Sequence, residues 1–363
     1  MKVLIYAING LGMGHLNRTL VLARAMRAND PTTEIHFIVD SPHFALVADS
    51  GFGVSKLPDR RHPLGFHCGR ERRYKKLPEL FDVFLEDWRP DVLLVDFLCK
   101  RALFEQVKER GVRLAAVLRK QRPGSLKQLS MNRGVGLVDA WLVPHTPQEW
   151  PLAQLPRRFR DRTTYLGPVS RSVDISRVPV LRQQHAAKEG LPRIVVTIGG
   201  GGAPESQKTL EAAEEALVQS GRSAHLLVVY GPNYPEAIPS DAVRGGVVVE
   251  RRRFVAELPE TLAAADLVIS NAGYNTMLEL RSAGTPAIIV PLSSTGRDDQ
   301  DQRAEDFVRE GRGLLSQPEV APMEASFRMI LDQAKIKRFE IKEGPDLSQQ
   351  GGQLLAALSD EVA

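Results

Sequence analysis

Short runs of apolar residues alternate with amphipathic segments almost from one end of the chain to the other. A run of four to eight apolar residues predicts a buried strand, and apolar residues at every third or fourth position predict a helix. Regular alternation of the two is typical of βα units, in which parallel strands form a sheet covered by helices. The pattern therefore predicts an α/β protein built on doubly wound parallel sheets.

The predicted strands fall into two sets. They cover residues 3–8, 34–39, 91–96, 113–118, 140–143 and 164–166, and then residues 194–198, 225–230, 247–250, 267–270 and 287–290. Between the sets lies Gly167-Pro-Val-Ser-Arg171, and 363 residues are enough for two domains with a core each. We expect domains at residues 1–170 and 171–363 that face each other across a cleft, with the C-terminal tail as a candidate to pack back on the first domain. Ligands of such sheets bind at the carboxyl ends of the strands.

The segment Ile269-Ser-Asn-Ala-Gly-Tyr-Asn-Thr-Met-Leu-Glu-Leu280 joins a predicted strand to a helix that should begin near Thr276. Free amide groups and the positive end of the helix dipole make such a helix start a natural binding site for phosphate. Glu279, one turn further on, could reach past the phosphate to a ribose hydroxyl. In the alternative interpretation, Asn271 and Asn275 only cap the helix and Glu279 is a solvated acid.

A second turn of this kind follows the predicted strand at residues 194–198. Gly199, Gly200, Gly201 and Gly202 are consecutive, and a helix should start at about Pro204. Because glycine lets another group approach the backbone closely, the run indicates a bound ligand.

Further along, Arg297-Asp-Asp-Gln-Asp-Gln-Arg-Ala304 opens another predicted helix. Asp299 and Gln300 offer oxygen acceptors and an amide, which suit the hydroxyl groups of a sugar. Asp298, Asp299 and Asp301 could also be metal ligands, but acidic residues are favoured in the first turn of any helix. We therefore expect no metal site and no cofactor.

The first predicted strand ends in Asn9-Gly-Leu-Gly-Met-Gly-His15, and a helix follows. A dinucleotide-binding turn requires the pattern G-x-G-x-x-G, but Gly10, Gly12 and Gly14 are spaced two apart and His15 occupies the place of the third glycine. An NAD(P)-binding oxidoreductase is therefore a less favoured alternative.

A histidine at this place is better explained by chemistry. Imidazole is a natural acceptor for a hydroxyl proton near neutral pH, and a helix N-terminus favours its neutral form. Asp96 ends the predicted strand at residues 91–96 and should come up at the same edge of the sheet, where it could hold the other ring nitrogen. We predict that His15 is a base and Asp96 its orienter. The alternatives are that His15 only packs or caps, and that Asp96 caps the next helix.

Charge is divided unevenly along the chain. Residues 1–170 hold 27 Lys and Arg against 17 Asp and Glu, whereas residues 171–363 hold 21 against 27. The basic half should bind something anionic. Its densest stretch, residues 60–76, could meet nucleic acid, lipid headgroups or a phosphorylated acceptor, or could be a solvated loop. We expect no nucleic-acid partner, because no recognised nucleic-acid module surrounds this stretch.

Cysteine content and hydropathy suggest where the protein works. Cys68 and Cys99 are the two cysteines, so a disulfide framework is not expected and a reducing compartment is the default. No apolar run reaches about 18 residues, so no membrane span is predicted. We expect a cytoplasmic protein, either free or peripheral at the inner face of the membrane.

Together these segments resemble the glycosyltransferases of the GT-B fold, in particular those of family 28 and bacterial family 1. This group includes the N-acetylglucosamine transferase of lipid II synthesis. The resemblance rests on Gly10-Leu-Gly-Met-Gly-His15, on the glycines at 199–202, and above all on residues 254–304, where the order and spacing of Ala283-Gly-Thr-Pro286 and Asp299-Gln-x-x-Arg-Ala304 follow the family.

The resemblance implies metal-independent, inverting transfer of a hexose from a UDP or TDP sugar to an acceptor hydroxyl. It implies donor diphosphate contacts from Gly199, Gly200, Gly201, Gly202, Gly273, Asn275 and Thr276. It further implies that Phe254 and Val255 meet the base, that Glu279 meets the ribose, and that Asp299 and Gln300 meet the donor sugar. On the acceptor side it implies His15 as base, Asp96 behind it, and a loop formed by Gly10, Gly12, Gly14 and Arg18. The acceptor itself is unknown, and the basic first half suggests an anionic or membrane-associated molecule.

Two departures from the family keep other functions open. Arg303 stands where the family has asparagine, and the first loop differs from the G-G-T-G-G-H of the lipid II enzyme. That loop also resembles nucleotide-sugar hydrolases of nonulosonic acid synthesis, in which the histidine would serve water. A transferase, a hydrolase and a non-catalytic nucleotide-sugar sensor are therefore separate hypotheses.

Overall fold

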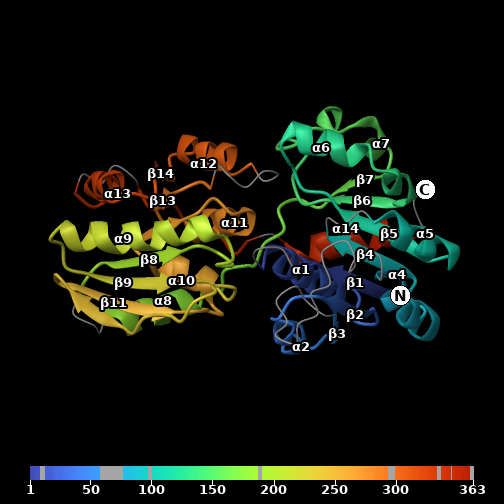
Figure 1. Ribbon diagram of the computed structural model, residues 1–363, viewed down its shortest axis with the longest axis horizontal. Helices are drawn as coiled ribbons and strands as arrows, with labels where there is room; N and C mark the ends of the chain where they lie inside the picture. The colour runs from blue at the N-terminus through green and yellow to red at the C-terminus, as the bar shows by residue number, and fades with distance from the viewer. Residues whose placement is uncertain are drawn as a thin grey trace. The chain divides into compact units, whose positions relative to one another are not determined.

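The chain forms two compact units in the computed structural model (Figure 1). The structure describes residues 1–8, 13–57, 77–96, 100–186, 190–292, 299–332, 337–344 and 346–359. Unit 1 consists of Met1–Gly10, His15–Val169 and Pro345–Ala363, and unit 2 consists of Leu11–Gly14 and Ser170–Gly344. Each unit is built around one seven-stranded sheet. The basic stretch at residues 60–76 lies outside the described residues.

The sheet of unit 1 is parallel throughout, in the order β3-β2-β1-β4-β5-β6-β7. Its strands are β1 (Lys2–Ala7), β2 (Glu34–Val39), β3 (Gly53–Lys56), β4 (Val92–Asp96), β5 (Arg113–Val117), β6 (Ala140–Val143) and β7 (Thr163–Tyr165). The strand order reverses between β1 and β4. At such a switch point the connections leave to opposite faces of the sheet, which opens a crevice at the carboxyl ends of the two strands.

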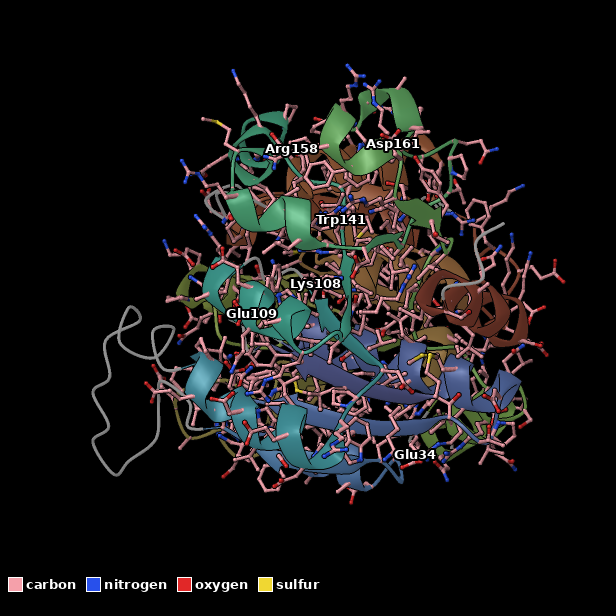
Figure 2. The ribbon with its side chains drawn as sticks, turned by 90° about the vertical axis from the view of Figure 1, so that its right-hand side faces the viewer. Glu34, Lys108, Glu109, Trp141, Arg158 and Asp161 are labelled. Carbon is pink, nitrogen blue, oxygen red and sulfur yellow. The ribbon has the colours of Figure 1, made fainter. Side chains whose placement is uncertain are left out.

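Helices cover this sheet on both faces. They are α1 (Gly14–Asn29), α2 (Ala45–Ala48), α4 (Leu77–Val83), η1 (Phe84–Trp88), α5 (Arg101–Glu109), α6 (Pro123–Ser130), η2 (Arg133–Leu137), η3 (Leu152–Gln154), α7 (Arg157–Arg160) and α14 (Leu347–Leu358). Figure 2 looks onto unit 1 with Lys108 of α5 and Trp141 of β6 labelled. Lys108 pairs with Asp139 at 2.8 Å, and the ring of Trp141 packs edge-on against Phe159 of α7. These contacts tie α5 and α7 to the β6 side of the sheet.

The C-terminal helix α14 belongs to unit 1 and packs on α1. The side-chain amide Nε2 of Gln350 donates to the carbonyl oxygens of Leu166 (3.1 Å) and Pro168 (2.6 Å), in the segment that follows β7. Gly351 lies against the carbonyl oxygen of Ala25, where a Cβ atom would come within 2.1 Å of that oxygen. The end of the chain thus returns from unit 2 to complete unit 1.

The sheet of unit 2 has the order β10-β11-β9-β8-β12-β13-β14 and is parallel except for the β10–β11 pair. Its strands are β8 (Arg193–Thr197), β9 (Ala224–Val229), β10 (Ala242–Arg244), β11 (Val247–Arg252), β12 (Leu267–Ser270), β13 (Ala287–Ile289) and β14 (Gly313–Leu315). Its helices are α8 (Arg177–Ala186), η4 (Pro204–Ser206), α9 (Gln207–Gln219), α10 (Leu258–Ala264), α11 (Tyr274–Ala283), α12 (Gln300–Arg309), α13 (Val320–Phe327) and η5 (Arg328–Asp332).

Alternating side chains of the unit 2 strands supply two separate cores. Val196 of β8 packs in a cluster with Leu210 of α9, and its neighbour Val195 packs in another cluster with Leu262 of α10. Because successive residues of a strand point to opposite faces, a sheet that is covered on both sides needs such continuous apolar runs. The predicted doubly wound parallel architecture is therefore confirmed.

Three described strands are absent from the sequence-based prediction, namely β3, β10 and β14. They have three or four residues each and lie at the edges of their sheets, where part of each strand is exposed. An edge strand buries fewer side chains than a central strand, so its sequence carries a weaker apolar signal.

Candidate active site

His15 and Asp96 meet at the carboxyl edge of the unit 1 sheet. β1 pairs with β4 in a register that sets Tyr6 beside Val95, so the connection from β1 to α1 emerges next to Asp96. Nδ1 of His15 lies 3.2 Å from Oδ2 of Asp96. The aspartate is fully buried, whereas the imidazole is 18% exposed. The structure thus brings together the two residues that we predict to be a base and its orienter.

Arg18 reaches the same carboxylate from one turn further along α1. Its Nε and Nη2 donate to Oδ2 of Asp96 at 3.1 and 2.7 Å, and the residue is 2% exposed. A buried arginine on a helix is no part of a loop open to an acceptor, so the expectation for Arg18 is wrong. The available signal was its spacing, because residues three apart on a helix share a face.

Arg18 also determines the charge of Asp96. Burial raises the pKa of the Asp96 carboxyl, but the charge of Arg18, the charge and hydrogen bond of His15 and the charge of Arg119 together outweigh burial and lower this pKa to about 2. Asp96 is therefore an anion near neutral pH. A carboxylate only accepts hydrogen bonds, so Asp96 at 3.2 Å favours the histidine tautomer that carries its proton on Nδ1, whereas Nη2 of Arg18, at 3.5 Å from the same nitrogen, favours the other. We assign the proton to Nδ1 because the contact with Asp96 is the shorter one. That tautomer leaves Nε2 of His15 with a free lone pair.

The alternative role for Asp96 does not fit the structure. Helix α5 begins at Arg101 with Lys100 as its N-cap, so Asp96 does not cap it. Of the glycines before His15, Gly10 and Gly12 lie outside the described residues. Gly14 is the first residue of α1, and a Cβ atom there would meet nothing within 4 Å. Among the described residues, none comes close to that side of Gly14.

In unit 2, the turn from β12 into α11 ends in a glycine. Gly273 is the N-cap of α11, so the N-cap residue offers no side chain to accept a hydrogen bond from the first amide groups of the helix. Asn271 is buried instead, and its amide donates to Thr209 Oγ1 (3.0 Å) and to the carbonyl oxygen of Val290 (2.8 Å). The alternative in which Asn271 and Asn275 cap the helix is therefore wrong. A helix N-terminus favours an anion through its amide groups and its dipole.

The glycine turn after β8 lies beside this helix start. β8 and β12 are neighbours in the sheet, with Thr197 opposite Ser270. A Cβ atom on Gly199 would lie 3.9 Å from Oγ1 of Thr276, and a Cβ atom on Gly273 would lie 3.8 Å from the same oxygen. The two predicted phosphate turns thus converge on the first turn of α11, which contains Asn275 and Thr276.

One glycine of this run has an internal reason to be glycine. Gly201 has a φ of 75°, and a Cβ atom there would lie 2.2 Å from the carbonyl oxygen of Tyr230. The backbone N–H of Asn233 also donates to the carbonyl oxygen of Gly200 at 2.8 Å. The turn is therefore packed against the loop after β9. Packing thus accounts for glycine at position 201, and a contact of Gly201 or its neighbours with a ligand stays a prediction.

Glu279 is buried in the second turn of α11 and pairs with Arg171. The guanidinium donates through Nε to Oε1 (2.8 Å) and through Nη2 to Oε2 (3.1 Å). Burial lowers the pKa of Arg171, but the charge and hydrogen bond of Glu279 and the charge of Glu260 together more than offset burial and leave the pKa above its usual value. The alternative that Glu279 is a solvated acid is wrong, and a ribose contact remains a prediction in which one carboxylate oxygen is shared with Arg171.

Phe254 and Val255 lie between β11 and α10, at the carboxyl edge of the sheet. The side chain of Phe254 is 41% exposed, and Val255 packs partly against the core around Leu262. An exposed aromatic ring at this edge is available to stack on a planar ligand.

Asp299 and Gln300 both have structural partners. Asp299 is the N-cap of α12 and accepts from the backbone N–H of Gln302 at 3.4 Å. Gln300 is buried, and its Oε1 accepts from the backbone N–H of Leu292 at 3.1 Å. Contacts of Asp299 and Gln300 with the donor sugar remain a prediction. Gln300 would make its contact through the N–H groups of its side-chain amide.

Two further properties concern the described part of the chain. It contains no group of three or more His, Cys, Asp or Glu residues that could hold a metal ion. Nor do its helices include one that is both apolar and long enough to cross a bilayer.

Comparison with known sequences gives a match for unit 2. Residues 193–334 match the glycosyltransferase family 28 C-terminal domain, and this span contains both glycine turns, α11 and α12. The chain is also 27% identical over 320 residues to the UDP-N-acetylglucosamine--N-acetylmuramyl-(pentapeptide) pyrophosphoryl-undecaprenol N-acetylglucosamine transferase of Thermobifida fusca (strain YX). That alignment covers 83% of this chain and 78% of the relative.

Comparison with solved structures extends the likeness to the whole chain. The spinosyn forosaminyltransferase SpnP has a TM-score of 0.67 and 19% identity, with 99% of each chain covered. A UDP-glucosyltransferase from Polygonum tinctorium has a TM-score of 0.65 and 16% identity, with 99% of this chain and 95% of the other covered. These likenesses show the GT-B fold.

Proposed function

We propose that this chain, a glycosyltransferase with the GT-B fold, moves a hexose from a nucleoside-diphosphate sugar to an acceptor hydroxyl. The donor is a UDP or TDP sugar, and the reaction inverts the anomeric centre and uses no metal ion. The N-terminus of α11, which has Gly273 as its N-cap and Gly199 close to its first turn, carries the proposal. Fixed amide dipoles there would stabilise the charge that develops on the leaving diphosphate.

The acceptor is activated by His15. Nε2 of His15 takes the proton of the acceptor hydroxyl while its oxygen forms a bond to the anomeric carbon on the face opposite the diphosphate. The bond from that carbon to the phosphate oxygen breaks, and the nucleoside diphosphate leaves with the electron pair. Asp96 at 3.2 Å from Nδ1 stabilises the resulting imidazolium, which later loses its proton to water.

The remaining donor contacts are assigned from their places around α11. The residues that would surround the diphosphate are Gly199, Gly200, Gly201, Gly202, Gly273, Asn275 and Thr276. Phe254 and Val255 would meet the base, Glu279 would share a carboxylate oxygen with a ribose hydroxyl, and Asp299 and Gln300 would meet the sugar.

The acceptor is proposed to be anionic or membrane-associated. Two observations support this, since residues 1–170 carry a net charge of +10 and the Thermobifida fusca relative is named for an acceptor that bears a pyrophosphoryl-undecaprenol group. A basic surface attracts phosphates and anionic lipid headgroups. We accordingly propose a cytoplasmic enzyme whose acceptor lies at the inner face of the membrane.

A thermal-shift panel with UDP, TDP, GDP, ADP, NAD and NADP tests the donor class. A ligand that binds only the folded protein raises its unfolding midpoint, so we expect a shift with UDP or TDP and none with NAD or NADP. EDTA should leave that shift and the turnover unchanged. A shift with NAD or NADP alone would contradict the proposal.

Product analysis then separates transfer from hydrolysis. With the donor identified in the panel and no acceptor present, we expect release of free sugar to be slow compared with transfer. Full-rate release of free sugar without any acceptor would instead show that His15 serves water.

A further inference from the structure

Arg303 of α12 reaches the turn that precedes α11. Its Nε and Nη2 donate to the carbonyl oxygen of Ala272 at 3.1 and 3.0 Å. Two donors of one guanidinium edge thus converge on a single carbonyl. Lysine is a point donor on a flexible stem and cannot reproduce this geometry. Ala272 directly precedes Gly273, the N-cap of α11.

The other groups of this turn are held from within unit 2. The side chain of Asn271 is anchored to Thr209 and Val290, and the backbone N–H of Gly273 donates to the carbonyl oxygen of Asn271 at 2.9 Å. Ala272 is fully buried. Arg303 therefore fixes the carbonyl group between two already fixed residues, and the peptide that leads into α11 is held on both sides.

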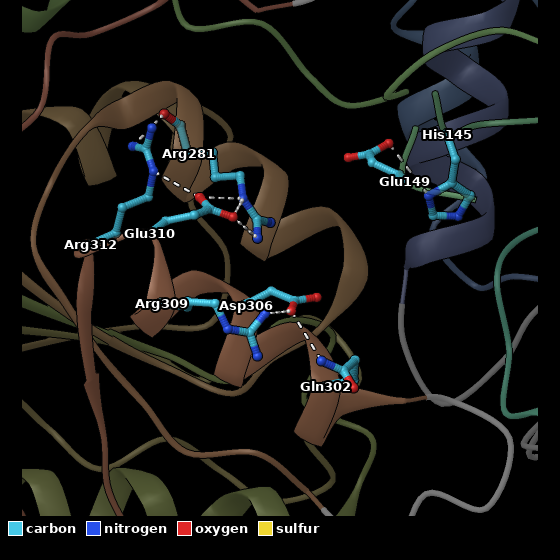
Figure 3. Close-up of polar contacts among 8 residues, drawn as sticks. All are labelled: His145, Glu149, Arg281, Gln302, Asp306, Arg309, Glu310 and Arg312. Carbon is cyan, nitrogen blue, oxygen red and sulfur yellow. Dashed lines mark hydrogen bonds and ion pairs between the residues drawn. The ribbon is translucent and has the colours of Figure 1, made fainter. Parts of the chain in front are cut away.

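Arg303 also comes from a helix that is firmly attached to α11. Arg281 of α11 forms a two-point contact with Glu310 at the end of α12, and Arg312 contacts the same carboxylate (Figure 3). Along α12, Asp306 accepts from Gln302 and from Arg309 (Figure 3). The Arg281–Glu310 contact therefore ties the far end of α12 to α11, the helix whose preceding turn Arg303 contacts.

The charge of Arg303 is in an unusual place. Cations stabilise the C-terminal ends of helices, and a positive charge beside an N-terminus opposes the helix dipole. Arginine is always protonated, so this repulsion cannot be relieved by loss of a proton. An anion bound at the start of α11 would reverse the sign of the interaction. Arg303 and the dipole of α11 would therefore act in the same direction on an anionic ligand.

We propose that Arg303 is a positioning residue for the donor diphosphate. It sets the peptide before α11 through the Ala272 carbonyl, and its permanent charge adds to the amide dipoles that receive the diphosphate. The inference rests on the proposed nucleoside-diphosphate donor and names a residue that controls how tightly its diphosphate is held.

Calorimetric titration of full-length variants tests the inference. The ligands are the nucleoside diphosphate that binds the wild type, the matching monophosphate and the matching nucleoside. We expect Arg303→Met to weaken binding of the diphosphate by about 10- to 100-fold, binding of the monophosphate by less, and binding of the nucleoside hardly at all. The variant loses hydrogen bonds and charge near the phosphate groups, which the nucleoside lacks. Arg303→Lys, which keeps the charge without the two-point contact, should fall between Arg303→Met and the wild type.

Arg182→Met is the matched control. Arg182 of α8 also donates a guanidinium N–H to an alanine carbonyl, that of Ala263, at 3.1 Å. The Arg182→Met variant should bind the diphosphate, the monophosphate and the nucleoside with wild-type affinity. The salt dependence of diphosphate binding should be shallower in Arg303→Met than in either Arg303→Lys or Arg182→Met, which a purely structural role would not produce.

The outcomes distinguish the inference from the proposed function. If the wild type binds a diphosphate and Arg303→Met binds it equally well, the inference is overturned and the proposed function stands. Equal weakening of all three ligands by Arg303→Met would also overturn it, because that indicates general distortion of unit 2. If the wild type binds no nucleoside diphosphate, the proposed function fails and this inference fails with it.

Discussion

Asp96 contacts two side chains of α1, Arg18 and His15, and its contact with one affects its contact with the other. Oδ2 accepts from both nitrogens of the Arg18 edge and lies 3.2 Å from Nδ1 of His15. Breaking a buried ion pair by removing one partner is costly, because the other charge stays behind without compensation. Arg18 therefore keeps Asp96 ionised in a buried place, and an ionised Asp96 is what orients His15.

Replacing the histidine tests its assignment as the base. His15→Ala should lower turnover by about 10²- to 10⁴-fold, the usual contribution of a general base. Donor affinity should stay close to wild type, because the proposed donor contacts all belong to unit 2. Steady-state kinetics and calorimetric titration measure the two effects. Unchanged turnover would show that another group takes the hydroxyl proton.

The Asp96–Arg18 pair makes a prediction about acid stability. The pKa of Asp96 is lowered from 3.8 to about 2 in the folded protein. The ionised carboxylate therefore adds to the free energy of unfolding above pH 4, and this contribution is lost as the pH falls from about 4 to about 2. The loss should amount to about 2 kcal/mol, from roughly 1.4 kcal/mol per pKa unit. Urea unfolding followed by tryptophan fluorescence measures it, since Trp88, Trp141 and Trp150 all lie in unit 1.

A double variant provides the reference for this measurement. Asp96→Asn combined with Arg18→Met removes both charges together, so no buried charge is left unpaired. Between pH 4 and pH 2 its stability should fall less than that of the wild type, by about the amount above. Equal falls in the two proteins would mean that Arg18 does not hold Asp96 in its ionised form.

At the scale of elements, the two helices that carry the proposed chemistry begin in different ways. α1 has His15 in its first turn and would act through a side chain, whereas α11 follows Gly273 and would act through its backbone amides. Both follow a central strand of their sheet, so a rigid support fixes their first turns. The elements around them supply the fixing contacts, from Asp96 of β4 in one unit and from Arg303 of α12 in the other.

The docking of α14 on α1 can be tested with two neighbouring glycines. A Cβ atom on Gly351 would lie 2.1 Å from the carbonyl oxygen of Ala25, whereas on Gly352 its nearest neighbour would be the side chain of Asn29 at 3.5 Å. Gly351→Ala should destabilise unit 1 by about 1–3 kcal/mol through overpacking, and Gly352→Ala should be neutral or stabilise it by up to about 1 kcal/mol.

Both substitutions raise helix propensity equally, so their difference isolates the contact with α1. Urea unfolding with tryptophan fluorescence again reports on unit 1. Coincident unfolding curves for the two variants would show that α14 does not pack on α1 as described.

At the scale of the whole molecule, net charge and local chemistry are separate. Residues 171–363 carry a net charge of −6, yet unit 2 holds the proposed diphosphate site. Backbone dipoles and Arg303 would supply the positive potential locally, whereas the field of a whole surface acts mainly on approach of a ligand. The basic residues 1–170 are suited to attracting the acceptor, and the chemistry itself depends on a few fixed groups.

Sequence by itself determined the parts of this protein that depend on local pattern. Apolar periodicity is a property of each segment, so it predicted the central strands and the doubly wound sheets, and it missed only the short edge strands β3, β10 and β14 among the described residues. The places of His15, Asp96 and the turn before α11 at the edges of their sheets could be predicted as well, because each lies at the end of a predicted strand or in the connection after it, and parallel strands bring their carboxyl ends to one edge.

Tertiary structure alone decided which partner each long side chain takes. Nothing in the local pattern indicates that Arg171 pairs with Glu279, that Arg303 holds Ala272, or that Gly201 packs against Tyr230. An arginine can reach many groups over its flexible length, and the choice depends on which residues distant in sequence the packed helices bring within about 3 Å. The local sequence therefore predicts at which edge of a sheet a site lies. The contacts that fix the groups of the site form only when the helices and strands of each unit pack together.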